Sequence, residues 1–117
     1  MNNFKGRDMK EIRAIVRPTR LPRLQAALRA IPNFPGLTVL PAQGFTAPAH
    51  TVKRTVKDEL TEFSDKCMVS ILVQPELEAE VRNTLLAACH TGQMGDGLVW
   101  SVDVHGVQRI RDQQTMV

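Results

Sequence analysis

A glycine-rich stretch near the end of the chain is the clearest candidate for binding chemistry. It covers residues 91–97, with the sequence TGQMGDG, and holds three of the seven glycines. Glycine lets a backbone approach a ligand closely and direct its N–H groups at an anion. A flexible turn between a helix and a strand is the alternative, and glycines alone favour that turn.

Two arginines, Arg109 and Arg111, form the second candidate. In a strand, residues two apart point the same way and lie about 7 Å apart. An extended segment over residues 107–111 would therefore present both guanidinium groups on one side. Guanidinium groups bind phosphate oxygens with bidentate geometry. The pair could bind successive phosphates of a nucleotide, and a solvated basic edge is the alternative.

The hydrophobic pattern predicts the elements that position these residues. Strands are predicted where apolar and polar residues alternate, over residues 9–16, 37–45, 67–73 and 99–104. Helices are predicted where apolar residues recur at helical spacing, over residues 21–31 and 75–88. The order is strand, helix, strand, strand, helix, strand. It predicts an α+β, ferredoxin-like βαββαβ sandwich, in which two helices cover one face of an antiparallel sheet.

Length and composition limit the remaining possibilities. The 117 residues suggest one domain over residues 9–111, with a loose leader at 1–8, a polar tail at 112–117 and a long loop at about 46–65. Aromatic residues make up 4% of the chain and tyrosine is absent, which argues against the stacking surfaces of most single-strand RNA binders. The net charge of +3 is too weak to indicate nucleic acid.

The sequence gives no indication of catalysis or metal binding. Three histidines, His50, His90 and His105, are spread out, and Cys67 and Cys89 match no metal-ligand spacing. We find no nucleophile–base pair, so we expect a protein that is not an enzyme. No apolar run approaches the roughly 20 residues of a spanning helix. Two cysteines without a disulfide framework weakly favour a reducing compartment, and we expect a cytoplasmic protein.

The motifs together resemble the P-II nitrogen regulatory protein family. The matching stretches, in chain order, are MKEIRAIVRP at 9–18, PGLTV at 35–39, GF at 44–45, TGQMGDG at 91–97 and VQRIR at 107–111. The resemblance covers nearly the whole chain, from about residue 9 to residue 111. Each motif alone is weak, but the glycine block followed by Arg-Ile-Arg is fairly specific.

The resemblance implies a homotrimer that binds an adenine nucleotide (ATP, ADP or AMP) in clefts between subunits. The expected nucleotide contacts, carried over by position, are Ile15, Gly36, Leu37, Thr38, Gly44, Phe45, Gly95, Asp96, Gly97, Arg109 and Arg111. The 46–65 loop would dock on a regulated partner, such as a membrane transporter, without inserting into the membrane. Its candidate contacts are His50, Lys53, Arg54 and Lys57, for which a solvated loop is the alternative.

The chain also departs from the family pattern. Typical members have a phosphate-binding lysine where this chain has Leu98. Typical members continue Gly-Phe with Gly-Arg-Gln, whose glutamine helps to hold Mg²⁺ and 2-oxoglutarate, whereas residues 46–48 here are TAP. We therefore leave Mg²⁺ open and do not expect 2-oxoglutarate sensing. Without tyrosine, uridylylation of the loop is excluded.

Three other functions fit the same fold. A ferredoxin-like sheet can bind nucleic acid, although the low aromatic content argues against this use. A small-molecule sensor of inorganic carbon or metal status is a second alternative. A small hydrolase is the third.

Overall fold

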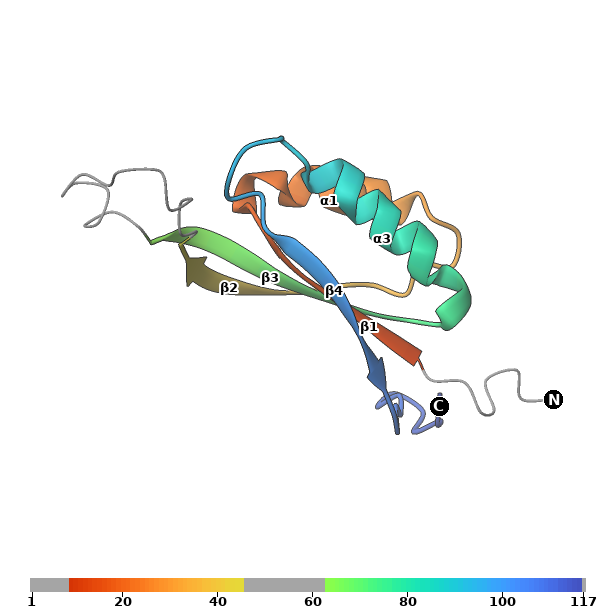
Figure 1. The fold of residues 1–117 in the computed structure, drawn as a ribbon. Coiled ribbons are helices and arrows are strands. Elements are labelled where there is room, and N and C mark those ends of the chain that lie inside the picture. Colours follow the sequence, from red (N-terminus) through yellow and green to blue (C-terminus); the bar gives the residue numbers. More distant parts are fainter. Residues whose placement is uncertain (1–8, 46–62, 117) are drawn as a thin grey trace, which may run out of the picture.

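The computed structural model describes residues 9–45 and 63–116. The elements in chain order are β1 (Met9–Val16), a 3-10 turn (Pro18–Arg20), α1 (Leu21–Arg29), β2 (Thr38–Gly44), β3 (Ser64–Val73), α3 (Pro75–Cys89) and β4 (Leu98–Val104). The strands form one sheet in the order β2-β3-β1-β4, and every neighbouring pair is antiparallel. Both helices lie on the same face of this sheet (Figure 1). The predicted ferredoxin-like α+β fold is confirmed.

The core lies between this sheet face and the two helices. Alternate residues of the central strands point into it and are fully buried, among them Ile12, Ala14, Val69 and Ile71. The helices contribute residues at the predicted helical spacing, namely Leu24 and Leu28 from α1 and Val81, Leu85 and Ala88 from α3. Cys67 and Cys89 are also buried and unpaired. Burial raises the pKa of the Cys89 thiol, which favours a structural role for it.

Both helices begin where the sequence predicts, with a proline in the first turn. Acidic residues Glu76 and Glu78 lie in the first turn of α3, where the helix dipole favours negative charge. α1 ends at Arg29, two residues before the predicted end. The N–H of Ile31 still donates to the Leu28 carbonyl at 3.0 Å, so the chain tightens into a turn there.

The C-terminal segment differs from the prediction. The sequence predicted an extended segment over residues 107–111, but residues 110–112 form a turn. The chain then folds back, with a bridge between Gln108 and Thr115 and a hydrogen bond from the Met116 N–H to the Val107 carbonyl at 2.7 Å. The expectation that Arg109 and Arg111 share one side of a strand is therefore wrong. Asp112 helps to make the turn, because its carboxylate accepts the Gln114 N–H at 3.0 Å.

The helices leave the opposite sheet face uncovered (Figure 1). Glu11 and Arg13 of β1 form an ion pair there at 2.8 Å, and Ser70 of β3 donates to Glu11. Beside them, one residue of each strand forms an apolar row across the sheet, in the order Leu40, Met68, Ile15 and Leu98. Leu40 and Leu98 are 56% and 73% exposed. No helix within residues 9–45 and 63–116 is long and apolar enough to span a membrane.

Two adjacent leucines of α3 test this packing. Leu85 is buried in the core and Leu86 is about half exposed. We expect Leu85→Ala to lower the free energy of unfolding by about 2–5 kcal/mol, because it leaves a cavity. The matched Leu86→Ala change should cost less than about 1 kcal/mol. Chemical denaturation measures both, and equal losses would contradict the orientation of α3.

Candidate functional site

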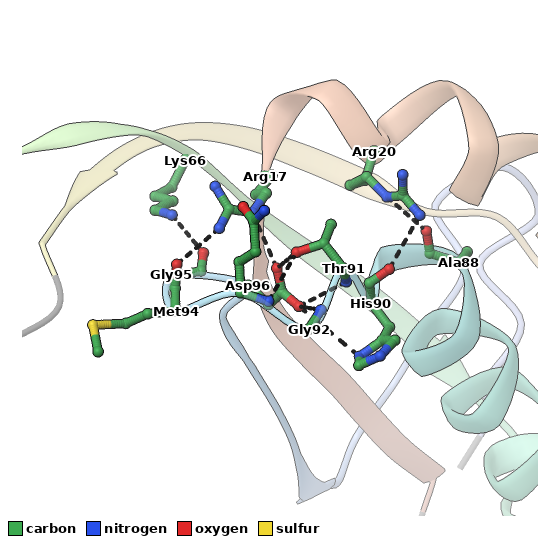
Figure 2. Close-up of polar contacts among 11 residues, drawn as sticks. Arg17, Arg20, Lys66, Ala88, His90, Thr91, Gly92, Met94, Gly95 and Asp96 are labelled. Carbon is green, nitrogen blue, oxygen red and sulfur yellow. Dashed lines mark hydrogen bonds and ion pairs between the residues drawn. The ribbon is translucent and has the colours of Figure 1, made fainter.

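Residues 91–97, called the glycine loop from here on, connect α3 to β4 (Figure 2). The loop packs against the ends of β1 and β3, next to the paired residues Val16 and Cys67. Arg17 follows Val16 and Lys66 precedes Cys67, so the two basic side chains begin one residue beyond this pair. We call Arg17 and Lys66 the cation pair.

The carboxylate of Asp96 organises the glycine loop. Its Oδ2 accepts the backbone N–H groups of Thr91 at 2.7 Å and Gly92 at 2.9 Å. Its Oδ1 accepts the Thr91 hydroxyl and Arg17 Nε, the latter at 3.1 Å. These hydrogen bonds, led by those from Thr91, hold the pKa of Asp96 far below its ordinary value. The ionised carboxylate therefore closes the loop on itself and joins it to the end of β1.

The cation pair binds the other side of the loop. Arg17 Nη2 donates to the Met94 carbonyl at 2.8 Å, and Lys66 Nζ donates to the Gly95 carbonyl at 2.6 Å. Lys66 is 9% exposed, so this hydrogen bond is shielded from water. The two carbonyl oxygens would repel an anion, and here each is neutralised by a cation.

Two glycines let the loop pass close to the sheet. A side chain at Gly97 would overlap the backbone carbonyl oxygen of Ile15, and its φ of +105° is one that other residues rarely adopt. Gly95 has a φ of +96°, and a Cβ there would lie 3.4 Å from nitrogens of both Arg17 and Lys66. The close approach of the loop to β1 therefore requires glycine at position 97.

Arg20 fixes the start of the loop. Its Nε donates to the Ala88 carbonyl at 3.1 Å, and its Nη2 donates to the His90 carbonyl at 3.2 Å (Figure 2). These carbonyls belong to the C-terminal end of α3, where the helix dipole favours a cation. The contact joins the turn before α1 to the end of α3.

Two cavities accompany these residues. A cavity of about 170 Å³ beside the glycine loop is lined mainly by apolar residues, including Ile15, Leu86 and Leu98, together with Asp96 and Gly97. A second cavity of about 350 Å³ lies at the N-terminal end of β2. Its lining residues are Pro35, Gly36, Leu37, Thr38, Ser70 and Leu72.

The structure brings one group of the predicted nucleotide contacts together. The first cavity and the cation pair gather Ile15, Gly44, Gly95, Asp96 and Gly97 at one end of the sheet. A Cβ added at Gly44 would lie 3.8 Å from Lys66, which itself binds Gly95. Next to Gly44, the ring of Phe45 packs edge-on against the ring of Phe63, with 5.0 Å between centroids.

A second group of the predicted contacts lies elsewhere in the protomer. Gly36, Leu37 and Thr38 stand at the far end of β2, since Thr38 pairs with Ser70 and Gly44 pairs with Ser64. The seven residues from Thr38 to Gly44 span roughly 20 Å of strand, at about 3.3 Å for each step from one residue to the next. The two ends of β2 therefore cannot contact the same phosphate within one protomer.

Arg109 and Arg111 form a third group, on the C-terminal turn. Arg109 Nη2 lies 2.9 Å from Asp112 Oδ2, and the Arg111 side chain is 78% exposed. The four predicted partner contacts, His50, Lys53, Arg54 and Lys57, lie outside the described residues. Most of the predicted 46–65 loop does too, except that residues 64 and 65 already belong to β3.

Sequence reasoning did not assign a role to Arg17, Lys66 or Arg20. Their role follows from tertiary structure, because the antiparallel pairing of β1 with β3 brings Arg17 and Lys66 to the same end of the sheet. Knowing that register would have identified the cation pair. Among residues 9–45 and 63–116, no three His, Cys, Asp or Glu side chains gather as metal ligands.

Comparison with known proteins assigns the family. A family model described as nitrogen regulatory protein P-II matches residues 9–114. The chain belongs to the P-II family. A nitrogen regulatory protein P-II of Azospirillum brasilense is 31% identical over 104 residues, covering 88% of this chain and 92% of the relative. One from Microchaete diplosiphon is 35% identical over the same length and with the same coverage.

A solved structure agrees with this assignment. The crystal structure of Arabidopsis thaliana PII bound to citrate superposes with a TM-score of 0.74 at 29% identity. The match covers 92% of this chain and 88% of the Arabidopsis chain. This P-II family chain is therefore a signal transduction protein, and the predicted family resemblance is confirmed.

Two glycines of this P-II family protein form a matched test of the loop. Both Gly97 and Gly106 have positive φ, but only at Gly97 would a Cβ overlap backbone atoms. We expect Gly106→Ala to cost about 1–2 kcal/mol of unfolding free energy through backbone strain alone. Gly97→Ala should cost clearly more and should speed amide hydrogen exchange at residues 91–97. Equal costs and unchanged exchange would contradict the close approach to Ile15.

Proposed function

We propose that this P-II family protein binds an adenine nucleotide at the glycine loop and passes the binding state to a regulated partner. The observation that carries the proposal is the glycine loop held by Asp96 and the cation pair at the end of the sheet. Arg17 and Lys66 together carry one positive charge more than Asp96, and ordered glycines beside this excess of positive charge favour an anionic ligand such as a phosphate chain. The cavity next to the loop adds apolar lining for a less polar part of the ligand.

The nucleotide site is built between subunits. The glycine loop, the Gly36–Thr38 turn and the two C-terminal arginines occupy three separate places in one protomer. A single nucleotide can contact all three only if a neighbouring protomer supplies at least one of them. The family resemblance implies the same arrangement, a homotrimer with nucleotides in the clefts between subunits.

The uncovered sheet face is the surface through which the trimer assembles. Its apolar row crosses all four strands, and Trp100 and Val102 of β4 lie beside it. Exposed apolar surface of this kind marks an interface in a soluble protein. Closed cyclic symmetry would bury one such face from each of three protomers around a common axis.

Light scattering coupled to size exclusion tests the trimer. We expect the wild-type mass to equal three chains of 13.0 kDa. Leu40→Asp places a charge in the apolar row and should yield monomers, whereas Ala79→Asp, at an exposed position of α3 away from the sheet face, should stay trimeric. A monomeric wild type, or a Leu40→Asp variant that stays trimeric, would contradict the proposed interface.

Lys66 connects the proposed nucleotide site to the start of the 46–65 loop, which we call the partner loop. Lys66 binds Gly95 and lies beside Gly44, where an added Cβ would be 3.8 Å from the Lys66 side chain, and Gly44 leads directly into Phe45. A ligand that moves the Gly95 carbonyl would change the Lys66 contact and hence the base of the 46–65 loop. Nucleotide binding would then shift the loop between states with different affinity for a partner, in the way that ligands shift two-state populations.

The proposal also covers the regulated partner and the location of the protein in the cell. We propose a cytoplasmic regulator whose loop residues His50, Lys53, Arg54 and Lys57 contact a regulated protein, with a membrane transporter as the first candidate. The role is regulatory rather than catalytic. In place of the phosphate-binding lysine of typical members, this chain exposes Leu98, so its binding of a triphosphate should be weaker than theirs.

Calorimetric titration with ATP, ADP and AMP tests nucleotide binding. We expect binding by the wild-type trimer and a loss of at least about tenfold in affinity in Arg109→Ala, because a charged hydrogen bond to phosphate is removed. Leu98→Lys should raise ATP affinity by about tenfold for the same reason, and Ala79→Lys, a charge-matched control at an exposed position of α3 that lines neither cavity, should not. An intact trimer that binds none of the three at millimolar concentration would refute the proposal.

A further inference from the structure

Arg109, which is proposed to bind phosphate, already forms an ion pair with the carboxylate of Asp112. Arg109 Nε donates to Asp112 Oδ1 at 3.1 Å, and Arg109 Nη2 lies 2.9 Å from Asp112 Oδ2. Two nitrogens of one guanidinium therefore face two oxygens of one carboxylate, which is the strongest geometry for such a pair. Arg111 Nη2 also approaches Asp112 Oδ2, at 4.0 Å.

The turn around these residues holds Asp112 in place. Its Oδ1 accepts the Gln114 N–H at 3.0 Å, and the Arg109 N–H donates to the Gln114 carbonyl at 2.9 Å. The Gln108 side chain closes the turn through a hydrogen bond to the Gln113 carbonyl at 2.6 Å. The hydrogen bond from Arg109 lowers the pKa of Asp112, so its carboxylate is ionised at neutral pH.

Phosphate and carboxylate use the same donors on a guanidinium group. A phosphate that binds Arg109 through Nε and Nη2 must displace Asp112, and a phosphate at the other edge of the guanidinium still meets the negative charge of Asp112 on the same turn. Repulsion between like charges grows with the charge of the ligand, so a triphosphate is penalised more than a monophosphate. The two guanidinium charges of Arg109 and Arg111 are thus offset in part by one carboxylate.

We propose that Asp112 is a specificity-determining residue of the nucleotide site, which competes with phosphate for Arg109 and shifts the preference from ATP toward AMP. This inference rests on the proposed function, since it assumes that Arg109 contacts the phosphates of a bound nucleotide. It is separate from the effect of Leu98, because Leu98 lies on β4 and removes an attraction, whereas Asp112 adds a competitor.

The test is the ratio of ATP affinity to AMP affinity, measured by calorimetry on the intact trimer. Asp112→Asn keeps an oxygen that can accept the Gln114 N–H but removes the charge. We expect the ratio to rise by about three- to fivefold, the effect of losing one exposed ion pair. Glu80→Gln removes a negative charge from the exposed side of α3 and should leave the ratio within about twofold of wild type.

Two more variants decide the mechanism. Asp112→Ser replaces the carboxylate by a hydroxyl and should raise the ratio as well, which keeps the test valid if Asp112→Asn fails to fold. In an Arg109→Ala background, Asp112→Asn should raise the ratio clearly less than it does beside Arg109, because only the repulsion between Asp112 and the ligand is then removed. An increase of the same size without Arg109 would overturn the competition for Arg109.

The outcomes separate this inference from the proposed function. Nucleotide binding by the wild type with an unchanged ratio in Asp112→Asn and Asp112→Ser overturns the role of Asp112 and leaves the proposed function standing. Binding of AMP but not ATP by the wild type, with ATP binding gained in Asp112→Asn, supports both. If neither the wild type nor any variant binds a nucleotide, both fall.

Discussion

The ionised carboxylate of Asp96 is the group on which the candidate site depends. It binds the backbone at the start of the glycine loop and Arg17 at the end of β1, so one side chain fixes both the shape and the position of the loop. The close approach of Gly97 to β1 depends on this position. The arrangement also explains why the carboxylate stays charged, since each of its partners is a hydrogen-bond donor.

The same contacts connect three parts of the chain that are far apart in sequence. Arg17 follows β1, Lys66 lies on β3, and the glycine loop follows α3 (Figure 2). Lys66 binds Gly95 and lies beside Gly44, the residue at which β2 ends, so this one side chain stands between the glycine loop and the start of the partner loop. In the proposed function, a change at the glycine loop would therefore reach Phe45 through Lys66 without a large rearrangement.

Local patterns in the sequence were sufficient to predict the fold but not to predict how the candidate site is built. Alternation in β1 and β3 and the apolar spacing of α3 could be predicted because each reflects burial on one face. The cation pair could not be predicted, because it depends on the register between β1 and β3. The extended conformation of residues 107–111 was predicted wrongly, because the pattern ignores Asp112, whose hydrogen bonds favour a turn.

A crystal structure of the trimer with an adenine nucleotide tests the central claim most directly. The account predicts one nucleotide in each cleft between protomers, with its phosphates bound by the glycine loop and by Arg109 and with at least one of its contacts supplied by the neighbouring protomer. A nucleotide bound within a single protomer, or phosphates that leave either the glycine loop or Arg109 without contact, would contradict it.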